Sequence, residues 1–317
     1  MEQIDRALGN GVRVSAWTFD ALYGRDGKFL DALHSRGEIF VGEIPSDFHG
    51  WVQRPTVLRT GRKKGRKGRR PKQSTRVARR CPSCEVRNLV TYSPVFREQS
   101  WQRYRVKDTN KGPEVWEVKW AVFWRKDQHG LPTRRHCLIV ARNVLTGDVK
   151  YFLSNRVPGE WNPYSGKRSV TLRWLLRVAF GRCSIESCFR DGKEELGLDH
   201  YEVRGWRCVH RHFYVTQLSQ LFCARVRQEY DKSRGDKLDR ITIEQVRSAM
   251  NVWLDAADLP AAARRERYEV ERKKQQYYQG RNRQARKSHT KTRRRRLLDI
   301  GIDIDKIKSC TFDTPAQ

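Results

Sequence analysis

One stretch of the sequence, RCSIESCFRDGKEELGLDHYEVRGW, carries acidic and basic side chains at helical spacing. At about 100° per residue, Glu186 and Lys193 fall within roughly 40° of Arg182 on a helical wheel. Arg190 lies close to them. One face of the predicted helix therefore presents a carboxylate flanked by cations.

Two interpretations of this face remain open from the residues alone. Most charged helix faces are solvated and hold i,i+4 ion pairs, and the spacing by itself favours that interpretation. The alternative is a metal-binding carboxylate beside cations that hold phosphates, because phosphodiester hydrolysis uses hard oxygen ligands and usually two Mg²⁺ ions. An adjoining apolar stripe of Val178, Ile185 and Leu196 is predicted to pack into the protein.

A second carboxylate, Asp20, follows a predicted strand near the start of the chain. Val12–Trp17 alternates like a strand that ends at Phe19-Asp20, Asp26–His34 fits a helix, and Glu38–Ile44 fits a second strand. Strand, turn, helix and strand in this order predict a parallel crossover. An Asp after a strand is more often a turn former, so these residues alone leave the role of Asp20 open.

The predicted secondary structure changes from strands to helices along the rest of the chain. Residues 81–157 are rich in alternating β-branched and aromatic residues, which predicts a small antiparallel sheet. Residues 168–196 and 206–230 show helical periodicity. Thr242 and Gln245 form a capping-box pattern that predicts the start of a further helix, which ends near Pro260.

The composition points to a long polyanionic partner. The 317 residues include 66 Lys and Arg against 36 Asp and Glu, which gives a net charge of +30. Nucleic acid is the leading candidate for such a chain. No apolar run reaches 18 residues, and the first residues lack an apolar signal segment. The eight Cys are predicted to be reduced thiols rather than a disulfide framework.

Basic residues concentrate in segments with few apolar side chains. Residues 52–80 are predicted to form a flexible loop, and residues 62–72 hold eight Lys and Arg. This density favours a DNA-phosphate clamp over a merely solvated loop. The basic runs 264–274 and 281–296 favour the same interpretation. The clamp is assigned to Arg62, Lys63, Lys64, Arg66, Lys67, Arg69 and Arg70.

Cys81 and Cys84 have the C-x₂-C spacing of a zinc knuckle. No second pair follows at a fitting distance, and His136 with Cys137 is only a distant partner. Ordinary reduced thiols are favoured over zinc.

The R-(3)-E-(6)-K spacing of Arg182, Glu186 and Lys193 resembles the signature of a branch of bacterial insertion-sequence DDE transposases. The surrounding KEELGLDHYEVRGWRCVHRHFYV resembles the same region of those enzymes. The segment WTFDALYGRDGKFLDALHSRGEIFVGEIPSD resembles the one that carries their second catalytic Asp, and YYQGRNRQARKSH resembles their tail. The resemblance covers nearly the whole chain.

This resemblance implies an α/β fold, a partial RNase H-like domain with a β-rich insertion between the second and third catalytic carboxylates. A helical C-terminal region follows. The implied divisions are 1–51 with 158–230 for the catalytic domain, 52–80 for the basic loop, 81–157 for the insertion, and 231–317 for the C-terminal region.

The resemblance also implies roles. Asp20 and Glu186 would be catalytic metal ligands for Mg²⁺, with Mn²⁺ as the alternative ion. Arg182 and Lys193 would hold phosphates near the scissile bond, and Arg190 is a weaker candidate. The partners would be insertion-sequence ends and target DNA, bound by a homodimer in the bacterial cytoplasm at the nucleoid. No small-molecule cofactor and no membrane are expected.

The sequence departs from the family pattern at two places. The signature normally begins with a Tyr three residues before the Arg, where this chain has Ala179. The first catalytic Asp, on the first strand of the fold, has no counterpart among the 19 residues before Asp20. The expectation is therefore a chain that begins inside the catalytic domain. Three interpretations stay open: part of a working transposase, a catalytically inactive DNA-binding remnant that inhibits an intact copy, or an unfolded pseudogene product.

Overall fold

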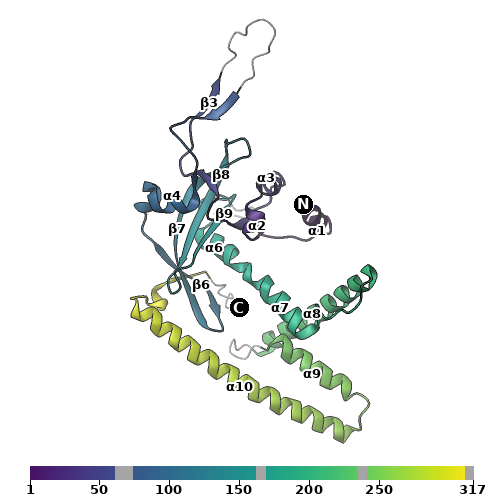
Figure 1. The fold of residues 1–317 in the computed structure, drawn as a ribbon. Coiled ribbons are helices and arrows are strands. Elements are labelled where there is room, and N and C mark those ends of the chain that lie inside the picture. Colours follow the sequence, from purple (N-terminus) through teal and green to yellow (C-terminus); the bar gives the residue numbers. More distant parts are fainter. Residues whose placement is uncertain (61–73, 162–168, 235–240, 311–317) are drawn as a thin grey trace. The chain divides into compact units, whose positions relative to one another are not determined.

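The computed structural model describes residues 1–60, 74–161, 169–234 and 241–310. The chain forms two compact units (Figure 1). The first comprises Met1–Thr109, Pro113–Arg182 and Arg296–Gln317, and the second comprises Asn110–Gly112 and Cys183–Arg295. In the described residues no helix is long and apolar enough to cross a membrane.

The first unit is built on a mixed sheet whose main strands are antiparallel. Its strand order is β1-β9-β8-β7-β2-β5, and β6 pairs with both β7 and β10. The strands are β1 Val41–Ile44, β2 His49–Trp51, β5 Cys84–Glu85, β6 Gln102–Thr109, β7 Gly112–Lys126, β8 Pro132–Asn143, β9 Val149–Ser154 and β10 Lys308–Ser309. The predicted antiparallel sheet is confirmed for β7, β8 and β9.

The core lies on both faces of β8. Successive side chains of a strand point to opposite sides of the sheet. Residues 136–141 are all buried because both sides of β8 are covered. Ile139 packs in a cluster with Leu175 and Leu176 of α6 (Leu172–Gly181). Leu138 and Val140 pack in a cluster that includes α3 (Gly27–Ser35), α4 (Val86–Tyr92) and α5 (Pro94–Arg97).

The N-terminal crossover is confirmed in the order of its elements, but its predicted first strand is misplaced. Residues 12–16 form no strand, and the segment that pairs is 17–19. After α1 (Glu2–Gly9), Trp17 forms a parallel bridge with Phe40. The backbone N–H of Val41 donates to the carbonyl of Trp17 over 2.9 Å, and the N–H of Glu43 donates to that of Phe19 over 3.0 Å. The extended segment therefore runs beside β1, with α3 as the connection.

The predicted β-rich insertion and the N-terminal crossover share one sheet. Strand β9 pairs antiparallel with β1, with Val41 opposite Ser154 and Ile44 opposite Tyr151. The fold is thus a mixed α/β fold, as predicted at that level. The RNase H-like topology and the functional division of the chain stay predictions.

The flanks of the basic segment are more ordered than their composition predicts. Strands β3 (Val57–Thr60) and β4 (Ser74–Val77) pair antiparallel, with Val57 opposite Val77. Residues 57–60 and 74–77 of the predicted loop are therefore paired strands, because the main-chain hydrogen bonds of a ladder form without buried side chains. The flexibility of the segment 52–80 stays a prediction.

The second unit is helical: α7 (Cys183–Leu196), α8 (Trp206–Arg234), α9 (Ile243–Asp255) and α10 (Ala261–Asp299). The capping box is confirmed, since the Thr242 hydroxyl accepts from the N–H of Gln245 and the Gln245 side chain accepts from the N–H of Thr242. Cys223 of α8 packs with Ile243 and Val246 of α9.

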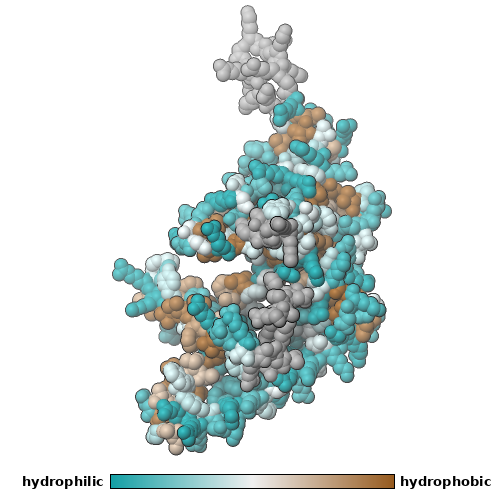
Figure 2. Space-filling model, turned by 180° about the vertical axis from the view of Figure 1, so that it is seen from behind, coloured by the Kyte–Doolittle hydropathy of each residue, from teal (hydrophilic) through white to brown (hydrophobic). Residues whose placement is uncertain are grey.

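Helix α8 presents large apolar side chains to solvent. Their exposed fractions range from 46% for Phe213 to 74% for Trp206. Brown patches lie on the part of the chain that contains α8 and α9 (Figure 2). The exposed side chains on α8 are Trp206, Phe213, Tyr214, Val215, Leu218, Leu221 and Phe222.

One helix through Arg182 was expected, and the structure has two. Helix α6 ends at Gly181, Arg182 is its C-cap, and α7 begins at Cys183. Arg182 keeps helical angles, with φ −54° and ψ −35°. The break ends the predicted apolar stripe: Ile185 is 47% exposed instead of buried, because it is on a different helix from Val178.

His136 makes the stability of the first unit depend on pH. Its ring is buried beside Phe40, with centroids 6.2 Å apart, and burial lowers the pKa of His136 to about 4. The folded state keeps the ring neutral while the unfolded chain binds a proton below pH 6.5. Stability is therefore retained above pH 6.5 and lost as the pH falls toward 4.

We expect a loss of about 2 kcal/mol in the free energy of unfolding from His136 between pH 7 and pH 5. Urea unfolding across this range measures it, with His136→Gln as the control that should lose less.

Gly42 is expected to tolerate no side chain. A Cβ at this position would overlap the ring of Phe19, which covers it. We expect Gly42→Ala to destabilise the protein by about 1–3 kcal/mol, the usual cost of overpacking a core. Thermal unfolding checks this against Gly9→Ala, because a Cβ at Gly9 meets nothing within 4 Å. Equal melting temperatures for the two variants would contradict the packing.

Candidate functional site

The position of Asp20 follows from the crossover. The segment Trp17–Phe19 is held against β1, and Asp20 is the next residue. Asp20 is the N-cap of the short helix α2 (Ala21–Gly24), where its Oδ1 accepts from the N–H groups of Leu22 and Tyr23 over 3.1 and 3.3 Å. The side chain is half-buried. The carboxylate is therefore fixed at the end of an extended segment.

The two cap bonds use only one oxygen of Asp20. Both go to Oδ1, and no hydrogen bond from the described residues reaches Oδ2. Asp26 makes the same kind of cap on α3, accepting from Lys28 and Phe29 over 2.9 and 3.3 Å, and it is exposed. Capping alone does not distinguish the two carboxylates. Asp20 differs because it directly follows the segment that pairs with β1.

Glu186, Arg190 and Lys193 are all exposed on α7. Glu186 is in the first turn of this helix, and Lys193 is seven residues later. Seven residues bring a side chain back to within about 20° on a helix, so Glu186 and Lys193 share a face of α7.

The opposite side of α7 is fixed by α8. Gly192 is buried, and a Cβ there would lie 3.3 Å from Gln220 Oε1 and 3.3 Å from Leu198 Cδ2. The Gln220 side chain is buried as well, and its Nε2 donates to the carbonyl of Cys188 over 2.6 Å. These contacts direct the charged face of α7 away from α8.

Arg190 is placed differently from Lys193. Its guanidinium lies 3.9 Å from Asp191, and it lines a pocket of about 450 Å³ together with Glu194, Glu195 and Asp231. Neighbouring carboxylates compete with a phosphate for this cation. The structure therefore gives the role of phosphate contact less support at Arg190 than at Lys193.

The predicted residues fall on both units. Asp20 and Arg182 belong to the first, while Glu186, Arg190 and Lys193 belong to the second. The assembly of Asp20 and Glu186 into one site is consequently a proposal. The predicted clamp residues Arg62, Lys63, Lys64, Arg66, Lys67, Arg69 and Arg70 lie outside the described residues.

Cys81 and Cys84 are free, half-buried thiols. His136 and Cys137 are buried in the sheet, and burial raises the pKa of the Cys137 thiol. Within the described part of the chain, no three or more His, Cys, Asp or Glu gather in a group that could hold a metal ion.

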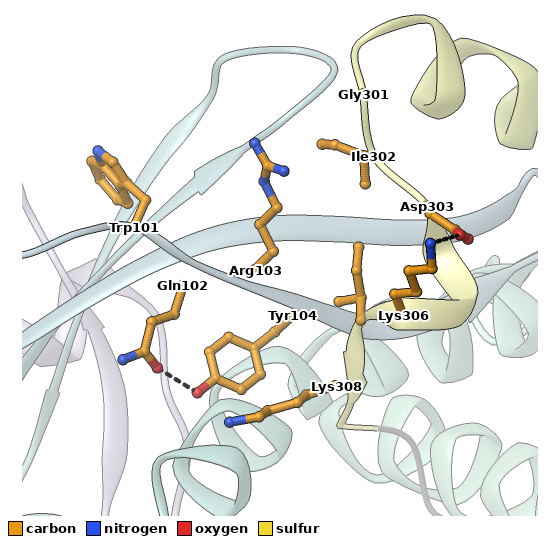
Figure 3. Close-up of a pocket in the computed structure, with 10 residues that line it drawn as sticks. Trp101, Gln102, Arg103, Tyr104, Gly301, Ile302, Asp303, Lys306 and Lys308 are labelled. Carbon is orange, nitrogen blue, oxygen red and sulfur yellow. Dashed lines mark hydrogen bonds and ion pairs between the residues drawn. The ribbon is translucent and has the colours of Figure 1, made fainter.

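A further pocket, of about 590 Å³, lies between β6 and the segment 301–308, where β10 pairs parallel with β6 (Figure 3). Tyr104 donates a hydrogen bond to Gln102 Oε1 over 2.9 Å, and Lys306 pairs with Asp303 over 3.5 Å. The elements that line this pocket carry neither Asp20 nor Glu186. Sequence reasoning did not find this pocket, because residues 301–308 show no motif that predicts their pairing with β6.

Residues 1–113 match a family model described as DDE superfamily endonuclease. The match includes Asp20 and ends before Glu186. No curated protein matches the chain. The match supports a DDE transposase or endonuclease family for this protein. A domain of this superfamily implies DNA as the substrate, and its members typically use divalent metal ions.

The described residues do not make a complete metal centre. Asp20 supplies one carboxylate with an available oxygen, and metal-assisted phosphodiester cleavage needs several oxygen ligands around two ions. No cluster of three or more such ligands is present in the described ranges.

Two substitutions separate the helix-capping role of Asp20 from its negative charge. Asp20→Ala removes the cap, and we expect it to destabilise the protein by about 1 kcal/mol. Asp20→Asn keeps an oxygen that accepts from Leu22 and Tyr23, so we expect a change below about 0.5 kcal/mol. Urea unfolding measures both, with Asp26→Ala and Asp26→Asn as the matched pair on α3. Equal losses for Asp20→Asn and Asp20→Ala would show that the cap does not hold this carboxylate.

Proposed function

We propose that the chain is a DNA transposase of the DDE type that cleaves and joins DNA strands at insertion-sequence ends. The observation that carries the proposal is the position of Asp20, at the end of a segment paired parallel to β1 and inside the range that matches the DDE endonuclease family. A strand–helix–strand unit with a carboxylate at its first strand end is what an RNase H-like catalytic domain requires.

In this proposal Asp20 and Glu186 are two of the carboxylates that hold divalent ions. Mg²⁺ is the proposed ion and Mn²⁺ the alternative, because both take carboxylate oxygens as ligands. When bound, such ions activate water and stabilise the leaving oxygen of a phosphodiester. Asp20 contributes Oδ2 while Oδ1 keeps the cap. A further ligand has to complete the set.

Cations would hold the DNA backbone beside these carboxylates. Lys193 shares a face of α7 with Glu186 and is exposed, which suits a phosphate contact near the scissile bond. Arg182, at the junction of α6 and α7, is proposed for the same role, with Arg190 the weaker candidate. A homodimer that holds two DNA ends, in the bacterial cytoplasm at the nucleoid, completes the proposal.

A second candidate function is a DNA-binding protein without catalytic activity. It is favoured by one observation, that the described residues hold no cluster of three or more metal ligands. Such a protein would keep the positive charge and occupy the DNA ends of an intact transposase.

Nicking of labelled duplex DNA tests the proposal. The probe is the DNA that flanks the gene, incubated with Mg²⁺ or Mn²⁺. We expect the wild type to nick, and we expect Asp20→Asn and Glu186→Gln to lower the rate about 100-fold or more, because each removes a metal-binding charge without removing volume. Lys193→Gln should weaken binding of the probe and retain some nicking.

Two acid-to-amide controls match these variants. Asp26→Asn alters the other helix-capping Asp, and Glu194→Gln alters an exposed acid on α7. Both should nick as the wild type does. Nicking by Glu186→Gln at the wild-type rate would overturn the assignment of the carboxylate. Binding without nicking by every variant and the wild type would favour the second candidate function.

A further inference from the structure

Helix α10 has two chemically different sides. It is a continuous helix of 39 residues (Figure 1). From Gln275 onward its partly buried positions follow one stripe, because they lie within about 60° of one another on a helical wheel. Near the start of α10, Glu271 accepts a hydrogen bond from the Ser248 hydroxyl of α9 over 2.7 Å. The stripe consists of Gln275, Gln279, Arg286, Thr290 and Arg293.

The other side is exposed and basic. Lys273 and Lys291 are 18 residues apart, which is five helical turns, so they point in the same direction. Lys287 lies within about 40° of them. All three are exposed, and no carboxylate of the described residues lies within ion-pair distance of them. Arg281, which donates to the hydroxyl of Tyr277 over 3.0 Å, and Arg295 flank this line.

The first turns of α10 are different in charge. There acidic residues alternate with the basic ones, and Arg272 pairs with Glu269 over 3.0 Å while Lys274 lies 3.8 Å from Glu271. From residue 272 to residue 298 the sequence has 12 Lys and Arg and neither Asp nor Glu. The acid-free basic face therefore begins at Lys273 and extends to Arg295.

We propose that this face of α10, from Lys273 to Arg295, binds the phosphates of duplex DNA along about one turn. It spans 22 residues, or about 33 Å at 1.5 Å per residue, close to the 34–36 Å repeat of B-DNA. The inference rests on the proposed function, which names DNA as the partner. It adds a DNA-binding surface that is distant in sequence from Asp20 and Glu186.

Charge and hydropathy on the face favour DNA over a lipid surface. A helix that lies in a membrane interface needs Trp, Phe or Leu opposite its cations. The partly buried stripe of α10 from Gln275 to Arg293 consists of Gln, Thr and Arg instead, and Leu297 beyond it is buried against Val115 and Ile302. Teal predominates along α10 (Figure 2). Contacts of this kind carry no base sequence information, so the face holds any duplex.

Salt-dependent binding of the full chain to a 20-base-pair duplex tests the inference. The variant carries Lys273→Gln, Lys287→Gln and Lys291→Gln. Each lost phosphate contact lowers the slope of log K against log salt by about 0.9. We expect the slope to fall by about 2.7 in magnitude and the affinity at 100 mM salt to fall at least tenfold.

The matched control removes three cations that already have carboxylate partners: Lys232→Gln, Arg272→Gln and Lys274→Gln, whose partners are Glu229, Glu269 and Glu271. It lowers the net charge by the same amount. We expect its salt slope to stay within about 1 of the wild type. Equal slopes for the two triple variants would overturn the inference, since only overall charge would then matter.

Other partners are outcomes of the same test. Loss of binding to duplex RNA or to phosphatidylserine vesicles, with DNA binding intact, would also overturn it. The nicking assay separates the two proposals. Wild-type nicking with an unaffected triple variant would reject only the α10 face, whereas absent nicking with the expected change of slope would reject only the catalytic proposal.

Discussion

The short parallel pairing between residues 17–19 and β1 is the constraint on which the candidate site depends. Three main-chain hydrogen bonds fix the segment, and the ring of Phe19 covers Gly42. The pairing ends where Asp20 turns into α2. Because β1 pairs on its other side with β9, the same ladder connects the crossover to the β-rich part of the chain. A shift of this register would move the Asp20 carboxylate and would also disrupt the packing of Phe19 in the core.

Local patterns predicted much of this arrangement. The alternation in β7, the apolar run in β8 and the capping box at Thr242 each have a chemical cause within a few residues, so the sequence alone is enough to find them. Asp20 was singled out from its place after a predicted strand, and its role stays a prediction. The resemblance to DDE transposases then supplied its proposed role.

Features that depend on distant partners were not predicted. The break at Arg182 interrupts a periodic sequence without a Pro at the junction, so periodicity continued through it. The β3–β4 pair depends on main-chain bonds between polar segments, which hydrophobic patterning does not detect. The pairing of β10 with β6 joins residues about 200 positions apart. On α10, the sequence showed the number of cations, but only the helix geometry separated the paired cations from the acid-free face.

The apolar surface of α8 has a consequence for how the chain is made. Large side chains from Trp206 to Phe222 face solvent in the described structure, and α9 packs on residues near Cys223 rather than on them. During synthesis, α8 leaves the ribosome before α9 and α10 exist. The apolar side chains of α8 are therefore exposed during synthesis and remain exposed in the described structure, where a surface of this kind favours association with another apolar surface.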